Sequence, residues 1–266
     1  MKRTKKGDIL NGPRPSVPRV DTVARALGIL ECFTAGEPEQ TLKQLCEKTG
    51  LYKSRVHRLC MTLLECGYLV RTSYSSYRLG PKLLVLGKVY ERTNTLISVA
   101  RTIMGRLAES AGESAALFAL EGDRSICLAR EYGPSRLYFA INEGDYMQLH
   151  ATAIGRVLLA HASEETRNSI LGRPLESVTP LTITDRRWIE QECGNILERG
   201  YSVNREEMEL GVAAVAAPVF DFEGKVPAAL CLVGPVQRFS EQILPGLVEK
   251  LLDATGEISR LMGEKR

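Results

Sequence analysis

The segment from Thr41 to Leu59, TLKQLCEKTGLYKSRVHRL, restricts the fold of this chain more than any other. Its apolar residues recur at helical spacing in two short runs, which predicts two amphipathic helices. Gly50 lies between the runs, where the chain must turn, and glycine adopts a positive φ without a steric clash. The polar face of the second helix carries cations and hydrogen-bond donors at Lys53, Ser54, Arg55, His57 and Arg58. This pattern is typical of a helix-turn-helix whose second helix enters the DNA major groove; the alternative is a helical hairpin with a solvated face.

Two short β-type runs follow the helix pair directly, in GYLVRTSYSSYRLG from Gly67 to Gly80. The polar stretch between them suits a hairpin loop, so the segment predicts a small wing and, with the helix pair, a winged helix-turn-helix. Wing side chains position a protein on the DNA backbone, and the candidates here are Arg71, Tyr77 and Arg78. An ordinary surface hairpin is the alternative.

Charge is distributed unevenly along the chain. Residues 1–95 hold 17 Lys and Arg against 8 Asp and Glu, a net charge of +9, whereas residues 96–266 hold 18 against 24, a net charge of −6. This asymmetry predicts a polyanion-binding part followed by a separate soluble part. Residues 1–19 combine cations and prolines without an apolar period, which predicts a mobile basic arm that either touches DNA or is a solvated tail.

Several classes of protein are disfavoured by the sequence. No apolar run approaches the roughly 20 residues of a membrane span, and the N-terminus lacks the apolar core of a signal peptide, which predicts a cytoplasmic protein. The 7 cysteines form no CxxC pair and the 3 histidines lack metal-ligand spacing, so no disulfide framework and no metal site are expected. Without a nucleophile–base pair, a Gly-rich phosphate loop or a paired acidic motif, we expect no catalytic residues and no cofactor.

Helices are predicted on both sides of the DNA-binding segment. A helix from Thr22 to about Phe33, capped by Asp21, precedes it, and its expected buried stripe is Val23, Ala26, Leu27, Leu30 and Phe33. Pro81 opens a very apolar linker helix that needs a cover, and self-association is the simplest one.

The second part of the chain alternates strand-like and helix-like runs, an α+β plan. Strands are expected over residues 115–120, 125–130, 137–141, 212–220 and 226–233, and helices over residues 96–110, 149–161, 164–171, 185–199 and 241–262. Thr184 is the expected cap of the helix over 185–199, and Gly200 its end.

The order of these motifs resembles the IclR family of bacterial transcriptional regulators from about Val20 to Gly263. The blocks that carry the resemblance are DTVARALGILECF, TLKQLCEKTGLYKSRVHRL, YRLGPKLLVLG, LHATAIGRVLLA and ERGYSVNREEMELGVAAVAAPVFDFEGKVPAALCLVGP. The resemblance implies a winged helix-turn-helix over 20–80, a linker helix over 81–95, and a GAF-like α/β domain for effector binding and oligomerisation over 96–266. It also implies a double-stranded DNA operator, a small-molecule effector, and a homodimer or dimer of dimers.

The chain departs from the family at its recognition helix. Family members commonly begin this helix Lys-Ser-Thr, whereas the third residue here is Arg55. Arginine suits bidentate contact with guanine O6 and N7, so we expect Arg55 to read a base and Arg58 to contact phosphate.

The predicted effector site begins at the small-residue helix start from Ala151 to Gly155. Free N–H groups at a helix N-terminus favour an anion, so a small organic acid or aromatic effector would place its anionic end there. In the resemblance, Asn204 becomes a rim contact, and Cys231 and Val233 stand where some members show hydroxyls. The candidate set is Ala151, Thr152, Ala153, Gly155, Asn204, Cys231 and Val233. The alternative is that Ala and Gly are there only for close packing.

Two further polar residues have structural interpretations. We expect His150 to hold the Ala151–Gly155 loop rather than to act in catalysis, and Glu206 to accept hydrogen bonds from loop N–H groups. A ligand-responsive repressor of the IclR type is the favoured function. An activator of the same family, an effector-independent DNA-binding protein and an enzyme with an incidental N-terminal module are the alternatives.

Overall fold

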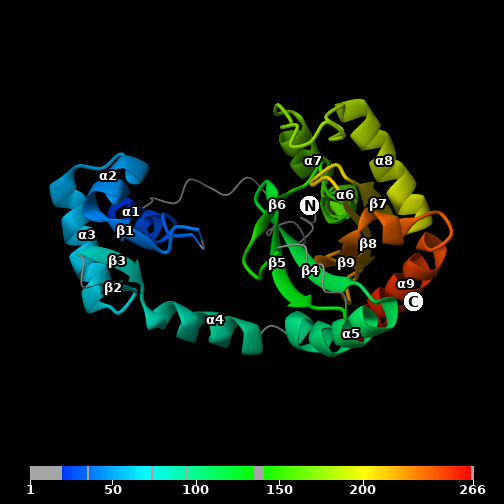
Figure 1. The fold of residues 1–266 in the computed structure, drawn as a ribbon, viewed down its shortest axis with the longest axis horizontal. Coiled ribbons are helices and arrows are strands. Elements are labelled where there is room, and N and C mark those ends of the chain that lie inside the picture. The colour runs from blue at the N-terminus through cyan, green and yellow to red at the C-terminus, as the bar shows by residue number, and fades with distance from the viewer. Residues whose placement is uncertain (1–19, 35, 73–74, 94, 135–140, 265–266) are drawn as a thin grey trace, which may run out of the picture. The chain divides into compact units, whose positions relative to one another are not determined.

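The computed structural model describes residues 20–34, 36–72, 75–93, 95–134 and 141–264. The chain divides into two compact units, Met1–Tyr90 and Glu91–Arg266, whose elements are labelled in Figure 1. The predicted basic arm lies outside the described residues, as does the predicted strand over 137–141 except for Ile141. Among the described residues, no helix combines the length and the apolar character that crossing a membrane requires.

The DNA-binding segment predicted in the first unit contains three helices and a small antiparallel sheet in the order β1-β3-β2. Its elements are α1 (Asp21–Leu30), β1 (Glu39–Thr41), α2 (Leu42–Thr49), α3 (Lys53–Glu65), β2 (Leu69–Arg71) and β3 (Ser76–Leu79). The predicted helix pair and hairpin are therefore present. Strand β1 was not predicted, because three residues are too few for a period-two pattern to show.

Local hydrogen bonds explain where α2 begins and ends. The Thr41 hydroxyl accepts a hydrogen bond from the Gln44 N–H at 3.3 Å, and the Gln44 side chain accepts one from the Thr41 N–H at 2.8 Å. This capping box fixes the first turn. Gly50 ends the helix at φ 67°, as predicted, and lets the chain turn into α3.

Helix α1 differs from its prediction in two ways. Its N-cap is Val20, and Asp21 lies inside the first turn, where its carboxylate accepts a hydrogen bond from Arg25 Nε instead of capping the helix. Val23 and Leu27 are 56% and 53% exposed, whereas Ile29 is fully buried. The apolar residues of α1 cover more than one face, so periodicity alone did not identify the face that packs on α3.

The described residues of the second unit form a six-stranded sheet in the order β6-β5-β4-β9-β8-β7, in which every neighbouring pair is antiparallel. The strands are β4 (Ser114–Glu121), β5 (Arg124–Glu131), β6 (Tyr146–Gln148), β7 (Ser202–Arg205), β8 (Val212–Val219) and β9 (Ala228–Pro235). Helix α4 (Pro81–Thr93) belongs mostly to the first unit and ends in the second. The other helices of the second unit are α5 (Thr95–Ala111), α6 (Ala153–His161), α7 (Glu164–Leu171), α8 (Arg186–Arg199) and α9 (Leu244–Leu261), with a 3₁₀ turn, η1, over Val236–Phe239. This arrangement confirms the predicted α+β class.

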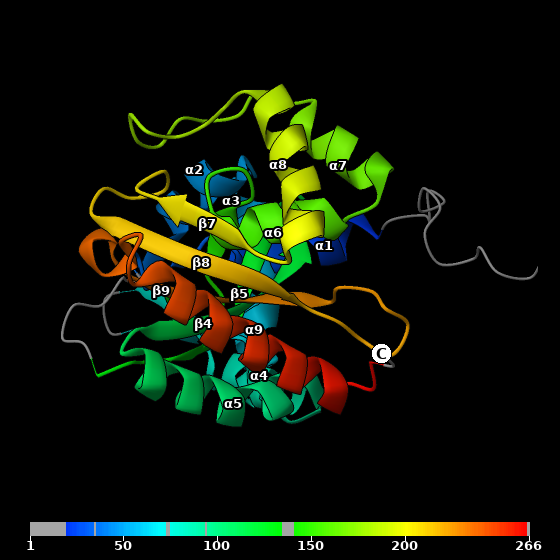
Figure 2. The same cartoon turned by 90° about the vertical axis from the view of Figure 1, so that its right-hand side faces the viewer.

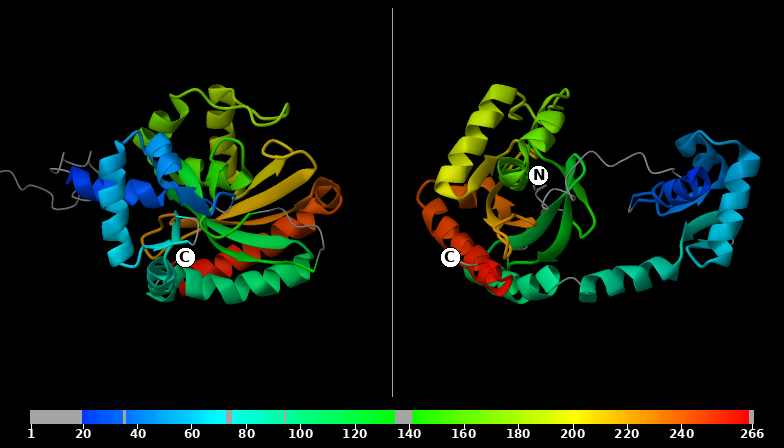
Figure 3. Two further views of the ribbon diagram at one scale, coloured as in Figure 1. Left: turned by 60° about the vertical axis from the view of Figure 1, so that its left-hand side comes forward. Right: turned by 180° about the vertical axis from the view of Figure 1, so that it is seen from behind.

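Helices cover both faces of this sheet (Figure 2). Helices α5 and α9 lie side by side on one face, and α6, α7 and α8 lie over the other (Figure 3). Successive strand residues therefore enter different cores: in β9, Leu230 and Leu232 pack towards α5 and α9, whereas Ala229 and Cys231 pack towards α6. Because both faces are buried, β8 and β9 are continuous apolar runs, which made them predictable from the sequence.

Helix starts in the second unit are set by side-chain caps. Helix α6 begins at Ala153 rather than at Leu149, because the Thr152 hydroxyl accepts the Gly155 N–H and caps it. Helix α8 is capped by Asp185, whose carboxylate accepts the N–H groups of Arg187 and Trp188, so the predicted cap at Thr184 is wrong. The short strands β6 and β7 were not predicted.

Candidate nucleic-acid interface and ligand cavity

Helix α3 presents a polar face that is separate from its core. All of the predicted contacts on it are exposed: Lys53, Ser54, Arg55, His57 and Arg58. The core side is formed by Val56, Leu59, Cys60 and Leu63. At about 100° per residue, Ser54 and Arg58 lie nearly opposite that core, whereas Arg55 lies on a flank. The two predicted arginine contacts on α3 therefore lie on different sides of the helix.

Two of the three residues predicted to contact DNA from the wing have exposed side chains. Arg71 and Arg78 are exposed, but Tyr77 is 1% exposed and belongs to the core of the first unit. The prediction that the Tyr77 side chain contacts DNA is therefore wrong. Side chains of a strand alternate between the two faces of the sheet, and Tyr77 lies on the face that packs against the helices.

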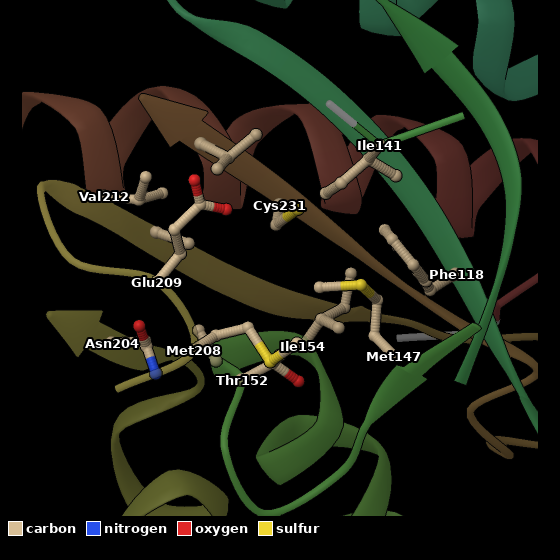
Figure 4. A pocket seen from close by; sticks show the side chains of 13 residues that line it. Phe118, Ile141, Met147, Thr152, Ile154, Asn204, Met208, Glu209, Val212 and Cys231 are labelled. Atoms are coloured by element: carbon tan, nitrogen blue, oxygen red, sulfur yellow. The ribbon is translucent and has the colours of Figure 1, made fainter. Parts of the chain in front are cut away.

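A small apolar cavity lies between the large sheet and the start of α6 (Figure 4). Its volume is about 40 Å³. Five of the predicted effector contacts line it: Thr152, Ala153, Asn204, Cys231 and Val233. Sequence reasoning missed other lining side chains, including Phe118, Met147, Ile154, Met208 and Glu209. Ile154 is the neighbour of Ala153 on α6, whereas the other four residues come from β4, β6 and the segment after β7, which no local motif joins to the α6 start.

Ala151 and Gly155, the other two predicted contacts, do not line the cavity. The Ala151 carbonyl accepts a hydrogen bond from Asn204 Nδ2 at 2.7 Å. A Cβ at Gly155 would stand 2.2 Å from the Leu149 carbonyl oxygen, so only glycine lets the helix start approach that backbone. Close packing, the alternative interpretation, therefore holds for Gly155, whereas Ala151 takes part through its carbonyl.

At the start of α6, the Thr152 hydroxyl has hydrogen-bond partners in the protein, whereas two backbone N–H groups have none among the described residues. The Thr152 hydroxyl donates to the Gln148 carbonyl at 2.8 Å and accepts the Gly155 N–H at 3.0 Å. Among the described residues, the N–H groups of Ala153 and Ile154 have no acceptor, as expected in the first turn of a helix. The cavity thus offers backbone donors at the start of α6.

Glu209 is the one charged side chain among the described residues that line the cavity. Burial raises the pKa of the Cys231 thiol to about 12, so this thiol stays protonated at neutral pH. Glu209 is exposed and brings a carboxylate to the lining, and none of the described lining residues is cationic. Figure 4 shows the Asn204 side-chain oxygen on the side of Glu209 and its nitrogen on the opposite side.

A buried ion pair connects α6 to the segment that carries Met208 and Glu209. Arg156 is 1% exposed, and its Nη1 and Nη2 donate to the two carboxylate oxygens of Glu207, the first at 3.1 Å. Its Nε donates to the His150 carbonyl at 3.0 Å, and its guanidinium lies 5.0 Å from the Trp188 ring centroid. Burial lowers the pKa of Arg156 to about 10, which still leaves it charged at neutral pH. Sequence reasoning missed Arg156, although a lone cation in the apolar run AIGRVLLA was a signal.

Two polar residues take the structural roles expected of them. His150 Nε2 lies 2.8 Å from the Glu176 carbonyl oxygen and must donate to it, since a carbonyl only accepts. Burial lowers the pKa of His150, which favours this neutral form. Glu206, at φ 62°, accepts the Gly211 N–H through its carboxylate at 2.8 Å. Both residues hold loops around the cavity.

Comparison with protein families decides the class of this chain. The family described as "Bacterial transcriptional regulator IclR C-terminal" matches residues 88–260, and "IclR helix-turn-helix domain" matches residues 22–73. The chain belongs to the IclR family. Its members are DNA-binding transcriptional regulators rather than enzymes, so the helix pair of the first unit and the cavity of the second lie in the DNA-binding and effector-binding parts of such a regulator.

Individual IclR-family proteins match over nearly the whole length. The HTH-type transcriptional regulator KipR of Bacillus subtilis is 34% identical over 91% of this chain and 97% of its own. The DNA-binding transcriptional repressor YiaJ of Escherichia coli is 30% identical over 90% and 86%. An IclR homolog of Microbacterium hydrocarbonoxydans, solved in complex with 4-hydroxybenzoate, superposes with a TM-score of 0.79 at 28% identity and covers 91% and 98%.

Proposed function

We propose that this protein is a cytoplasmic repressor that binds a pseudo-palindromic operator and responds to a small organic acid. The observation that carries the DNA-binding part is the exposed cationic face of α3 opposite its buried stripe. Relatives named as repressors, such as YiaJ, support repression as the mode of control.

The structure leads us to exchange the roles first expected for the two arginines of α3. Ser54 and Arg58 lie farthest from the core and are therefore best placed to reach base edges in the groove. Arg55 lies on a flank, where a DNA backbone passes when a helix sits in the major groove. We assign Arg58 to base readout and Arg55 to phosphate, with Arg71 and Arg78 on the wing as further backbone contacts.

The effector is assigned to the cavity beside α6. Its anionic end would accept hydrogen bonds from the Ala153 and Ile154 N–H groups at the positive end of the helix. Glu209 would repel a carboxylate at its own side, which orients the ligand. Asn204 supplies a polar contact, and Cys231 and Val233 form the wall. The 4-hydroxybenzoate bound to the Microbacterium hydrocarbonoxydans homolog, an acid with an aromatic body, supports this class of ligand.

The cavity must enlarge to admit such a ligand. A cavity of about 150 Å³ accommodates benzene, and this one measures about 40 Å³. Met147 and Met208 line it, and the flexible methionine side chain rearranges readily. A ligand that stabilises the enlarged state over the small one shifts the population between them, which is the basis for changing DNA affinity.

Filling the cavity tests this assignment. A calorimetric screen of small organic acids and aromatics first identifies a ligand that changes the affinity for DNA. Val233→Trp adds bulk to the wall at a residue that is 5% exposed and should abolish that ligand's effect while leaving DNA affinity without ligand unchanged. Ala214→Met, a smaller change in the same lining, should weaken the effect.

Leu197→Trp on the outer side of α8, where Leu197 is 53% exposed, is the matched control and should respond like the parent. Thermal unfolding identifies any variant that loses its fold through overpacking. A folded Val233→Trp protein that responds normally would place the effector site elsewhere.

We also propose a homodimer or dimer of dimers. Leu84, Val85 and Leu86 on α4 are 66%, 57% and 45% exposed, which is a large apolar surface to leave in water. Light scattering at micromolar concentration should give two or four copies, and Leu84→Glu with Val85→Glu should lower that number. Leu197→Glu is the equally exposed control. A monomeric parent protein, with and without DNA, would contradict this proposal.

A further inference from the structure

The cationic face of α3 continues into a hollow between α1 and α3. A concavity of about 330 Å³ is lined by Thr22, Arg25, Arg55, Arg58, Leu59 and Thr62. Three guanidinium groups and two hydroxyl groups therefore share one hollow, and none of the described residues that line it is acidic. Arg25 was not among the predicted DNA contacts. It lies on α1, which precedes the helix pair.

The charges of this hollow are incompletely neutralised by the protein. Arg25 forms an ion pair with Asp21 at 2.6 Å, but the side chains are 35% and 68% exposed, so the pair contributes little. Arg55 and Arg58 are exposed and form no ion pair within the described part of the chain. Neighbouring like charges disfavour one another, so the hollow favours an anion that bridges them.

We propose that this hollow, here called the α1–α3 clamp, holds a phosphate group of the DNA backbone between Arg25 and Arg55, with the hydroxyls of Thr22 and Thr62 as further donors. The planar guanidinium pairs with phosphate oxygens through two parallel hydrogen bonds, and hydroxyls add further donors. Arg58, which is assigned to base readout, lines the same hollow and lies on the outermost face of α3, so the clamp borders the surface offered to the major groove. Backbone phosphates flank that groove on either side.

The inference rests on the proposed DNA-binding function and is tested with duplex DNA of arbitrary sequence, since phosphate contacts do not depend on sequence. The affinity of the full-length protein for a 30-base-pair duplex is measured by fluorescence anisotropy over a series of NaCl concentrations. Arg25→Gln should weaken binding on the order of tenfold at low salt. It should also reduce the slope of log affinity against log salt by about 1 for each protomer bound.

Three control variants test whether Arg25 affects DNA binding through its charge or through its ion pair with Asp21. Arg25→Lys keeps the cation and should retain most of the slope. Asp21→Asn removes the competing carboxylate and should strengthen binding by about two- to fivefold, a gain that loss of a merely structural ion pair would not give. Arg106→Gln removes an arginine of the second unit that is likewise paired with a carboxylate, here Glu257 at 2.6 Å, and should change nothing.

The outcomes distinguish the clamp from the function on which it rests. A parent protein that fails to bind duplex DNA at low salt would overturn both. Parent binding with an unchanged slope in Arg25→Gln would overturn the clamp alone. Inorganic phosphate that raises the melting temperature only when Arg25 is present, without an effect of Arg25→Gln on DNA binding, would assign the hollow to free phosphate and also overturn it.

Discussion

Arg156→Ala is expected to lower the free energy of unfolding of the second unit by about 3–5 kcal/mol. The substitution leaves the Glu207 carboxylate buried without its guanidinium partner and removes the donor to the His150 carbonyl. Trp188 is the only tryptophan of the chain and lies beside Arg156, so its fluorescence during denaturant unfolding reports on this unit alone. The unfolding midpoint should fall accordingly.

Two further variants show that burial, rather than charge itself, causes this loss. Arg106→Ala breaks the exposed Arg106–Glu257 pair and should cost about 0–1 kcal/mol. Arg156→Met combined with Glu207→Leu removes both buried charges and should recover a large part of the stability. If Arg156→Ala and Arg106→Ala have equal effects, the buried pair does not have the structural importance assigned to it.

Arg58→Ala is expected to weaken binding to the selected operator by about 1–3 kcal/mol, roughly 5- to 150-fold, and to relax the preference at one base position in each half-site. The reason is its place opposite the buried stripe of α3. Arg55→Ala should weaken binding to the operator and to unrelated duplexes by similar factors, because a phosphate contact carries no sequence information. Competition titrations with both kinds of duplex measure the difference. The reverse pattern would return base readout to Arg55.

The features predicted well from the sequence depend on neighbouring residues. The helix pair follows from two apolar stripes and the Gly50 turn, which all lie within one short segment. The apolar runs of β8 and β9 were visible because helices cover both faces of their sheet. At the cavity, Thr152 and Ala153 were predicted because a helix N-terminus is a local feature with local chemistry.

The features that were missed depend on contacts between distant segments. Tyr77 is buried because it packs into a core formed by residues of α1, α2 and α3 that are distant from it in the sequence. Arg156 and Glu207 are 51 positions apart, so nothing local joined them. Glu209 reaches the cavity wall because the segment after β7 folds back over α6, and no periodicity encodes that path.

Selection of duplexes from a random-sequence pool by the full-length protein tests the central claim most directly. A symmetric IclR-family regulator that reads DNA through α3 should enrich an inverted repeat, with half-sites separated by about one helical turn or a multiple of it. Selection with Arg58→Ala should give the same spacing with one base position degenerate in each half. Absence of any enriched motif, or an identical motif from both proteins, would contradict the account.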